Sequence, residues 1–424
     1  MMHRTVVTGQ EKLKNALNHR EGLIPLDLGA TSVSGIHAST LAALRRHYGL
    51  SDGPIKIHEP YQMLGLPEED LLQWIGADVG GVSPPLTMFG FESKDWKEWK
   101  TPWGQVVLVA ADFQVDEKED GVYIYPGGDR DAPPSGKMPL TGYFFDSIIR
   151  QGQIDRDNLN VEDNLEEFGP ISDDVLKSMK KQVEAIRPTG RGIIAAIGGT
   201  AFGDIAVVPA PFLKYPKGIR DIAEWYMVTA AKPEFVHKIF SRQLEIALKN
   251  LAKVHETFGD EIDVLYICGT DFGTQSSTFC SPKTYRNLWH SYYKEVNDWV
   301  HRHTTWKTFK HSCGAVAGFL PLFIESGFDI INPVQCSAKG MDARTIKEAY
   351  GDQLVFWGGG VDTQLTLPFG TPEQVRKQVW ERCEIFSKNG GFVFSTVHNI
   401  QAKTPVENVV AMYETFQEFN GTWR

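Results

Sequence analysis

Eight short apolar segments, spaced along the chain and mostly separated by helix-like stretches, constrain the fold most strongly. Each is rich in branched apolar residues, and most run into a Gly, Asp, Ser or Thr. In chain order they are LIPLDLG (23–29), ADVGGVS (77–83), GIIAAIGG (192–199), DVLYICGTD (263–271), TFKHSCG (308–314), DIINPVQ (329–335), LVFWGGGVD (354–362) and GFVFSTVHN (391–399). Strands joined by helices pair in parallel, and eight of them close into a barrel. The pattern therefore predicts an α/β fold, a (β/α)8 TIM barrel with its chemistry at the carboxyl ends of the strands.

Two of the intervening stretches carry clear helix signals. Ser172 is a good N-cap for a helix that presents an apolar face and stops before Pro188. A second helix is predicted from Pro372, in its first turn, to a stop at Gly390. Both fit the crossover helices of a parallel barrel.

Residues 87–150 break this rhythm. They alternate like β-hairpins and are rich in aromatics, namely Trp96, Trp99, Trp103, Tyr123 and Tyr125. We expect one barrel domain spanning 1–424, with residues 87–150 inserted after the second strand as a β-rich cap. The aromatics either shape the mouth of the barrel or attach the cap to it. The acidic stretch 155–167 is predicted to be a solvated linker.

Composition excludes several classes of partner. The formal net charge is −10 and no basic cluster is visible, which disfavours nucleic acid and anionic membranes. No run approaches the roughly 18 apolar residues of a membrane span. Five cysteines form an odd set, and the N-terminus lacks the apolar core of a signal peptide. We expect a soluble, cytoplasmic protein.

The fifth segment holds a histidine and a cysteine two positions apart. Side chains at i and i+2 of a strand share one face, so His311 and Cys313 both aim inward at the strand end. The eighth segment places His398 at the same rim. Imidazole and thiolate are good zinc ligands, and a catalytic zinc usually has three protein ligands plus an open position. A buried histidine and cysteine without a metal are the alternative.

Several segments, in order and spacing, resemble the uroporphyrinogen decarboxylase superfamily, and more closely its corrinoid-dependent methyltransferase branch. The likeness is densest from Asp263 to Asn408. It covers IDVLYICGTDFGTQ, SPKTYRNLW, KTFKHSCG, ESGFDIINPVQ, GGGVDTQLTLPFGTPEQV and TPVEN. The resemblance implies a zinc enzyme that exchanges a methyl group between a small molecule and the cobalt of a corrinoid.

In that branch the metal is held by an H-x-C pair and a cysteine six residues before a Thr-Pro. His311 and Cys313 match the pair, whereas the position six residues before Thr404 is His398. With two histidines and one thiolate, zinc keeps a charge of +1 and is more Lewis acidic. Such a zinc favours an oxygen leaving group over a substrate thiolate. We therefore expect O-demethylation, for example of an aryl methyl ether, with methylcobalamin:thiol methyl transfer as the alternative.

Three further residues are candidates for catalysis. Asp271 matches an acidic position of the family and is expected to orient substrate or water, or else to be a turn or cap residue. Gln275 lies at the same rim as a hydrogen-bonding candidate. Asp362 matches a family position after the glycines at 358–360, which either admit a corrinoid or only form a turn.

Two other functions compete with methyl transfer. A true uroporphyrinogen decarboxylase needs arginines near its first strand for the carboxylates of its substrate, and none lies between Arg20 and Arg45. A metal-free enzyme of that kind, or a non-catalytic corrinoid- or ligand-binding barrel, is the remaining alternative. The sequence has no D-x-H-x-x-G stretch. The corrinoid is therefore expected on a partner protein that docks over the barrel mouth.

Overall fold

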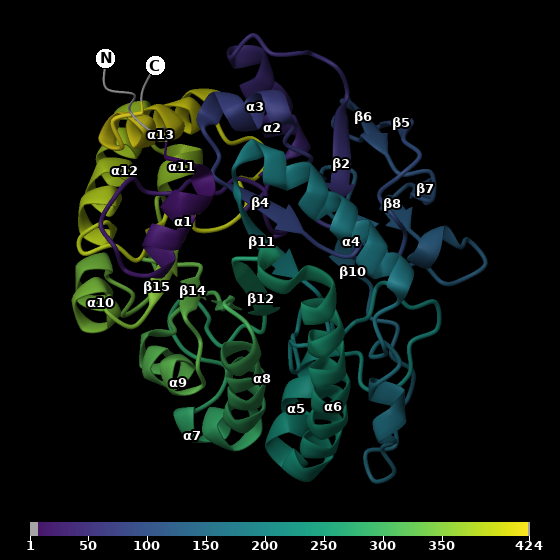
Figure 1. Ribbon diagram of the computed structural model, residues 1–424. Helices are drawn as coiled ribbons and strands as arrows, with labels where there is room; N and C mark the ends of the chain where they lie inside the picture. Colours follow the sequence, from purple (N-terminus) through teal and green to yellow (C-terminus); the bar gives the residue numbers. More distant parts are fainter. Residues whose placement is uncertain (1–6, 423–424) are drawn as a thin grey trace.

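The computed structural model describes residues 7–422, and its centre is a curled, TIM-like parallel sheet of seven strands (Figure 1). The strands follow one another in the order β16-β15-β14-β13-β12-β11-β4. They are β4 (Val79–Val82), β11 (Gly192–Ala196), β12 (Val264–Cys268), β13 (Lys307–His311), β14 (Ile330–Asn332), β15 (Val355–Trp357) and β16 (Phe392–Val393). Each coincides with one of the last seven predicted segments, except that β13 begins one residue earlier, at Lys307. The α/β class is thus confirmed.

The first predicted strand is shorter than expected. Leu26 forms a single parallel bridge with Phe394, just beyond β16. The carbonyl of Leu26 accepts the N–H of Asp78, just before β4, at 2.8 Å. Pro25 has no N–H to donate, which explains why the segment does not extend into a longer ladder. This short segment nevertheless connects the two edges of the curled sheet.

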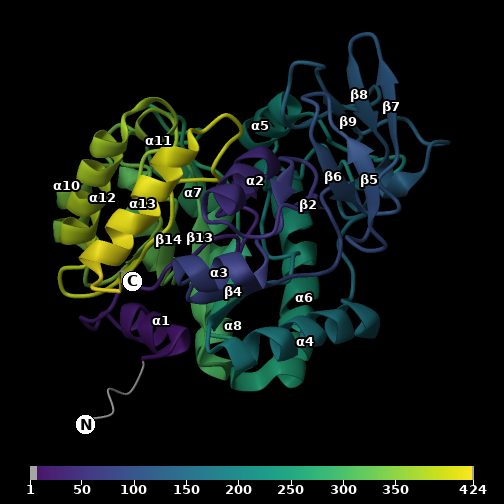
Figure 2. The same cartoon turned by 90° about the horizontal axis from the view of Figure 1, so that it is seen from above.

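Helices surround the sheet (Figures 1 and 2). They are α1 (Gly9–Leu17), α2 (Ala38–His47), α3 (Glu69–Ile75), α4 (Asp173–Ile186), α5 (Ile222–Ala231), α6 (Pro233–Phe258), α7 (Pro282–Tyr285), α8 (Ser291–His303), α9 (Leu320–Glu325), α10 (Ala343–Tyr350), α11 (Thr366–Phe369), α12 (Pro372–Phe386) and α13 (Val406–Phe419). A π-helical turn, Arg286–His290, joins α7 to α8. Within 7–422, none of the helices is both long and apolar enough to cross a bilayer.

The predicted caps set the starts of two helices. The hydroxyl of Ser172 accepts the N–H of Val175 at the start of α4. Thr371 and Gln374 form a reciprocal capping box at the start of α12, which ends at Phe386, before Gly390. These helices therefore begin where the sequence places them.

Helix α1 covers the amino end of the barrel. Its Leu13, Ala16 and Leu17 are buried in one apolar cluster with the inward-facing side chains of the strands. These strand residues are Val79, Ile194, Val264, Phe309, Ile330, Val355, Trp357 and Val393. The barrel interior is therefore packed on this side, and the opposite end, where the strands finish, holds the polar side chains.

Residues 7–422 contain nine more strands, and those labelled in Figure 2, β2 and β5 to β9, lie on the side away from α10 and α12. A five-stranded sheet contains β1 (Ile36–His37), β2 (Ile55–Glu59), β3 (Leu64–Gly65), β5 (Lys97–Lys100) and β6 (Val106–Val109). A four-stranded antiparallel sheet contains β7 (Val115–Lys118), β8 (Gly121–Ile124), β9 (Gly136–Met138) and β10 (Asp146–Ser147). Because β2 pairs with β6, the larger sheet joins segments from both sides of β4. The boundaries 87–150 of an inserted cap, and a single domain over 1–424, stay predictions.

The expectation of a solvated linker at 155–167 is wrong for its second half. Asn164 is buried and exchanges hydrogen bonds with the backbone of Ile219. Both oxygens of Glu167 accept bonds from Arg220, whose side chain is 1% exposed. A buried guanidinium requires such partners, so this acidic stretch is held against the domain.

Candidate metal centre

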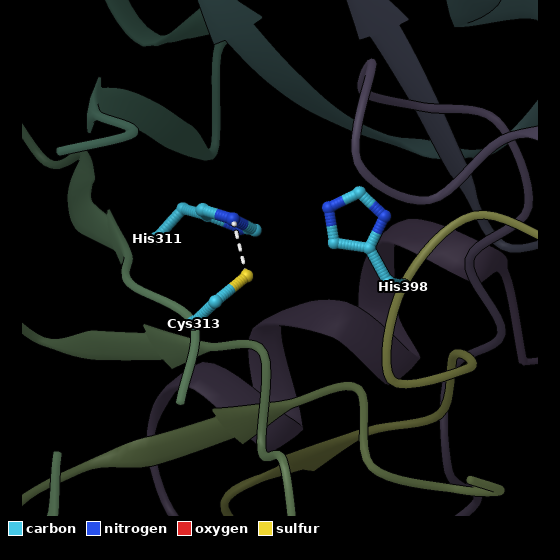
Figure 3. A group of neighbouring side chains, drawn as sticks. All are labelled: His311, Cys313 and His398. Atoms are coloured by element: carbon cyan, nitrogen blue, oxygen red, sulfur yellow. Dashed lines mark hydrogen bonds between the residues drawn. The ribbon is translucent and has the colours of Figure 1, made fainter. Parts of the chain in front are cut away.

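The three predicted metal ligands come together at the carboxyl end of the barrel (Figure 3). His311 is the last residue of β13, Cys313 follows it by two positions, and His398 lies beyond β16. Their donor atoms all lie within 4.8 Å of one another, and Sγ of Cys313 is 3.3 Å from Nε2 of His311. The curvature of the sheet thus brings the ends of β13 and β16 close together, although they are far apart in the sequence.

The imidazole of His311 is held in an orientation that suits a metal. Its Nδ1 lies 2.6 Å from Oδ1 of Asn332, and Nδ2 of Asn332 donates to the carbonyl of Trp357 at 2.9 Å. Since the amide nitrogen is used by that carbonyl, Oδ1 is the acceptor for the Nδ1 proton of His311. The lone pair of Nε2 then faces Cys313, as in metal sites whose histidines are oriented by an outer partner.

In His398, Nδ1 accepts a hydrogen bond, whereas in His311 the same atom donates one. The backbone N–H of Asn399 donates to Nδ1 of His398 at 2.8 Å. A neutral imidazole carries one proton, so this bond places that proton on Nε2, toward the other two side chains (Figure 3). Binding a metal through Nε2 therefore requires the proton to move to Nδ1 and the bond from Asn399 to be released. His311 needs no such change.

Burial sets the charge state of all three groups. It lowers the pKa of His311 and that of His398 to about 4, and it raises the pKa of the Cys313 thiol well above its ordinary value. The Asp271 carboxylate adds to the effect on Cys313. Near neutral pH the imidazoles are therefore uncharged, which is the form that binds metals, and the thiol gives up its proton when a cation replaces it.

Asp271, predicted to be catalytic, lies beside this group on the loop after β12. Its Oδ1 accepts the backbone N–H of Cys313 at 2.7 Å and is 3.9 Å from Nε2 of His311. Burial raises the pKa of Asp271. The carboxyl therefore adjoins the three candidate ligands without belonging to them, where it can hold a proton.

A second buried carboxyl, Asp204, was not foreseen from the sequence. It follows β11, accepts the backbone N–H of Ala206, and is 8% exposed. Burial raises the pKa of Asp204 to about 6, and the nearby Asp271 adds to this effect. The only sequence signal for Asp204 is its place shortly after the third apolar segment.

Gln275 belongs to a hydrogen-bond chain at the rim. Its Nε2 donates to the carbonyl of Ser337 and its Oε1 accepts from Nε2 of Gln335 at 2.9 Å. Oε1 of Gln335 in turn accepts the backbone N–H of Gly314, next to Cys313. Gln275 is thus connected to the cysteine loop, and its contact with a substrate stays a prediction.

Asp362 stabilises the turn after β15. Its Oδ1 accepts the backbone N–H groups of Gln364 and Leu365, at 2.9 and 2.6 Å. Its Oδ2 is buried and has no hydrogen-bond partner among residues 7–422. The turn explains an aspartate at this position, and a catalytic role for it stays a prediction.

Lys310, between the inward-facing residues of β13, is a fully buried cation behind the site. Its Nζ donates to the carbonyls of Thr270 and His311 at 2.6 and 2.7 Å. It also lies 5.0 Å from the ring centroid of Phe272 and 5.3 Å from that of Phe323. The loop that carries Asp271 is therefore attached to β13 through this lysine.

A pocket of about 550 Å³ opens beside Asp271, between α5 and the chain from Thr270 to Trp289. Its lining comprises Gly203, Ile205, Trp225, Tyr226, Thr229, Ala230, Pro233, Thr270, Asp271, Phe272, Phe279, Cys280, Lys283, Thr284, Asn287, Leu288 and Trp289. Cavities of roughly 300–1,000 Å³ with mostly apolar walls are typical of small-molecule sites. Asp271 thus belongs both to the pocket wall and to the surroundings of the metal centre.

Comparisons with known proteins agree with this architecture. The family model described as uroporphyrinogen decarboxylase (URO-D) matches residues 162–419. A methyltransferase from Methanosarcina mazei has a similar fold, with a TM-score of 0.53 and 15% identity over 97% of this chain and 99% of that one. No curated protein sequence matches significantly.

Two solved hydrolases are more distant. PbGH5A, a glycoside hydrolase family 5 enzyme from Prevotella bryantii B14, has a TM-score of 0.32 and 11% identity, covering 62% of this chain and 80% of its own. Endo-glycoceramidase II from Rhodococcus sp. has a TM-score of 0.36 and 10% identity, covering 58% and 66%. These scores are too low to bear on function, and at 15% identity the methyltransferase likeness concerns the fold alone.

Proposed function

This chain belongs to the uroporphyrinogen decarboxylase family, and we propose that it is a zinc-dependent enzyme that moves a methyl group between a small substrate and a corrinoid protein. The observation that carries the proposal is the convergence of His311, Cys313 and His398 at the carboxyl end of the barrel. Two imidazoles and a thiol form a donor set that zinc prefers. The fold similarity to a methyltransferase supports it.

The donor set fits zinc in its spacing and in its charge. With zinc–ligand bonds of about 2.0 to 2.3 Å, two donors on one ion lie at most about 4.6 Å apart, which is close to the limit of 4.8 Å found here. His311 is already oriented by Asn332, whereas His398 must exchange its bond with Asn399. When bound, zinc supplies a Lewis acid for the substrate heteroatom.

We propose methyl ethers, including aryl methyl ethers, as the substrates. Two neutral imidazoles and one thiolate leave the site with a charge of +1, which stabilises an oxygen anion better than it activates a thiolate. In the reaction the methyl–oxygen bond breaks, the oxygen keeps the electron pair and takes a proton, and cob(I)alamin supplies the pair for the new bond. We assign that proton to Asp271, whose position beside Cys313 and raised pKa support the role. Thiol methylation is the alternative direction.

The corrinoid is assigned to a partner protein, because the sequence contains no D-x-H-x-x-G stretch. Porphyrinogen decarboxylation is disfavoured, although the family bears its name. The segment around Leu26 offers no arginine between Arg20 and Arg45 to bind a carboxylate-rich substrate.

The proposal is tested by the zinc content of the purified protein, measured by plasma mass spectrometry after metal-replete expression. We expect about one zinc per chain, lost in Cys313→Ala and in His398→Ala. His303→Ala and Cys383→Ala are the matched controls, since both residues lie outside the cluster. A zinc-free parent protein contradicts the mechanism. With zinc established, methyl transfer from methoxybenzene derivatives to cob(I)alamin is the assay of function.

A further inference from the structure

Five of the seventeen residues that line the pocket beside Asp271 are aromatic. Trp225, Tyr226, Phe272, Phe279 and Trp289 all line it. The rings of Tyr226 and Phe279 stack at 5.2 Å with an interplanar angle of 22°, and Phe279 is 40% exposed. Flat, rigid surfaces of this kind favour a ligand that is itself flat and apolar.

The charged side chains of the pocket are one acid and one base. Asp271 is the single acidic residue of the lining and Lys283 the single basic one. Asp271 contacts Cys313 and so marks the inner end, whereas Lys283 is exposed on α7 and marks the outer rim. The side chain of Lys283 has no ion pair or hydrogen bond with any residue from 7 to 422. This exposed lysine is therefore free to pair with an anionic group of a ligand at the rim.

Tyr226 adds an unused polar group near the inner end. Its hydroxyl oxygen is buried and has no hydrogen-bond partner within the described part of the chain. Burial raises the pKa of Tyr226, and the charge of Asp271 adds to this, so the hydroxyl keeps its proton. A buried hydroxyl without a partner is costly, so a shift of the Tyr226 ring that turned the hydroxyl toward a ligand oxygen would be favourable.

We propose that this pocket binds an aromatic carboxylate, with its ring against Tyr226 and Phe279, its carboxylate on Lys283 and its ether oxygen toward Tyr226 and Asp271. The inference rests on the proposed function and narrows its substrate class from methyl ethers to methoxylated aromatic acids. The cavity of about 550 Å³ accommodates one substituted ring. The main competing ligand is an aliphatic quaternary amine with a carboxylate, which aromatic rings also attract.

Binding is measured with the full chain by quenching of tryptophan fluorescence, since Trp225 and Trp289 line the pocket. The probes are 4-methoxybenzoate, methoxybenzene and glycine betaine. We expect 4-methoxybenzoate to bind tightest. Lys283→Met is expected to weaken it about fivefold and to leave methoxybenzene unchanged, because an exposed ion pair contributes up to about 1 kcal/mol. Lys249→Met, on the exposed face of α6, is the matched control and is expected to change neither.

Phe279→Ala provides an independent test of the ring contact. It is expected to weaken 4-methoxybenzoate and methoxybenzene alike. Equal effects of Lys283→Met and Lys249→Met on 4-methoxybenzoate, or tighter binding of glycine betaine, overturn the proposal. Thermal melts of each variant show that the chain is folded. Because these assays need neither zinc nor corrinoid, the pocket assignment can succeed where methyl transfer fails, and the two failures are distinguishable.

Discussion

Oδ1 of Asn332 lies 2.6 Å from Nδ1 of His311, and this contact decides which nitrogen of the imidazole faces the metal centre. The asparagine itself is fixed by the carbonyl of Trp357, one strand further along the sheet. A backbone carbonyl on β15 thus orients a side chain on β14, which orients a candidate metal ligand on β13.

Replacing Asn332 with alanine is therefore expected to weaken zinc binding by about 10- to 100-fold, the usual effect of losing an outer partner of a metal ligand. Competition with a chromophoric chelator measures the affinity. Asn297→Ala is the control, because Asn297 is also a fully buried asparagine that donates to a backbone carbonyl, that of Ser326, away from the cluster. Equal zinc affinity in the two variants would show that the orientation of His311 does not depend on Asn332.

For Asp271, the informative change is to asparagine. The amide oxygen can still accept the N–H of Cys313, so we expect the zinc content to be unchanged. Methyl transfer is expected to fall by about 100-fold, the lower range for losing a group that transfers a proton. Steady-state rates measured beside Asp298→Asn, an exposed residue of α8, check this. Full activity of Asp271→Asn would show that Asp271 stabilises the loop and takes no part in proton transfer.

Asp27 gives a pH-dependent prediction. Burial raises the pKa of Asp27 to about 6. Because this exceeds the unfolded value of about 3.9, the folded state binds the extra proton, and the stability contributed by this group is present below about pH 4 and lost as the pH rises through 6. The Asp27→Asn variant has no carboxyl to titrate at this position, so its stability does not fall in this way as the pH rises. Its free energy of unfolding relative to the parent should therefore increase by about 2 kcal/mol between pH 4 and pH 7.

Urea unfolding at both pH values measures that difference. The bonds that Asp27 accepts from Trp357 and Ala30 change in the variant at every pH, so they shift both values equally. A constant difference between variant and parent would mean that Asp27 is ionised in the folded protein throughout this range.

Lys310→Met tests the buried cation. The substitution leaves the carbonyls of Thr270 and His311 without their donor, which we expect to lower the free energy of unfolding by about 2 kcal/mol after relief of the buried charge. Lys294→Met, on the exposed face of α8, should stay within about 0.5 kcal/mol of the parent. Chemical denaturation measures the free energy of unfolding of both variants. Equal values would show that Lys310 does not stabilise the fold.

The strands were predictable because a strand buried on both faces leaves a nearly continuous apolar run in the sequence. The same rule, applied to the strand ends, gave His311, Cys313 and His398 as neighbours. It failed for the first strand, where Pro25 limits pairing to one bridge. It also gave no hint that β2 pairs with β6, since hairpin patterns report only local pairing.

The residues that support the site were harder to predict. Asn332 ends the apolar run of its strand and Asp204 follows one, and polar residues at such places are commonly turn formers, so nothing in one sequence separates them from ordinary loop positions. Lys310 reads as a polar residue directly before His311, and its burial depends on the aromatic rings of Phe272, on the loop after β12, and of Phe323, in α9. These contacts are set by packing between elements.

The bridge at Leu26 also bears on how the chain reaches its final form. It pairs with residues at the far end of the sheet, and the neighbouring bond from Trp357 to Asp27 spans 330 positions. During synthesis Leu26 is made long before its partner Phe394, so the Leu26 segment keeps an unpaired edge until the last strand has been made. Pairings this distant form slowly, and open edges invite association with other chains. The interval before closure is therefore when a newly made chain most needs protection from aggregation.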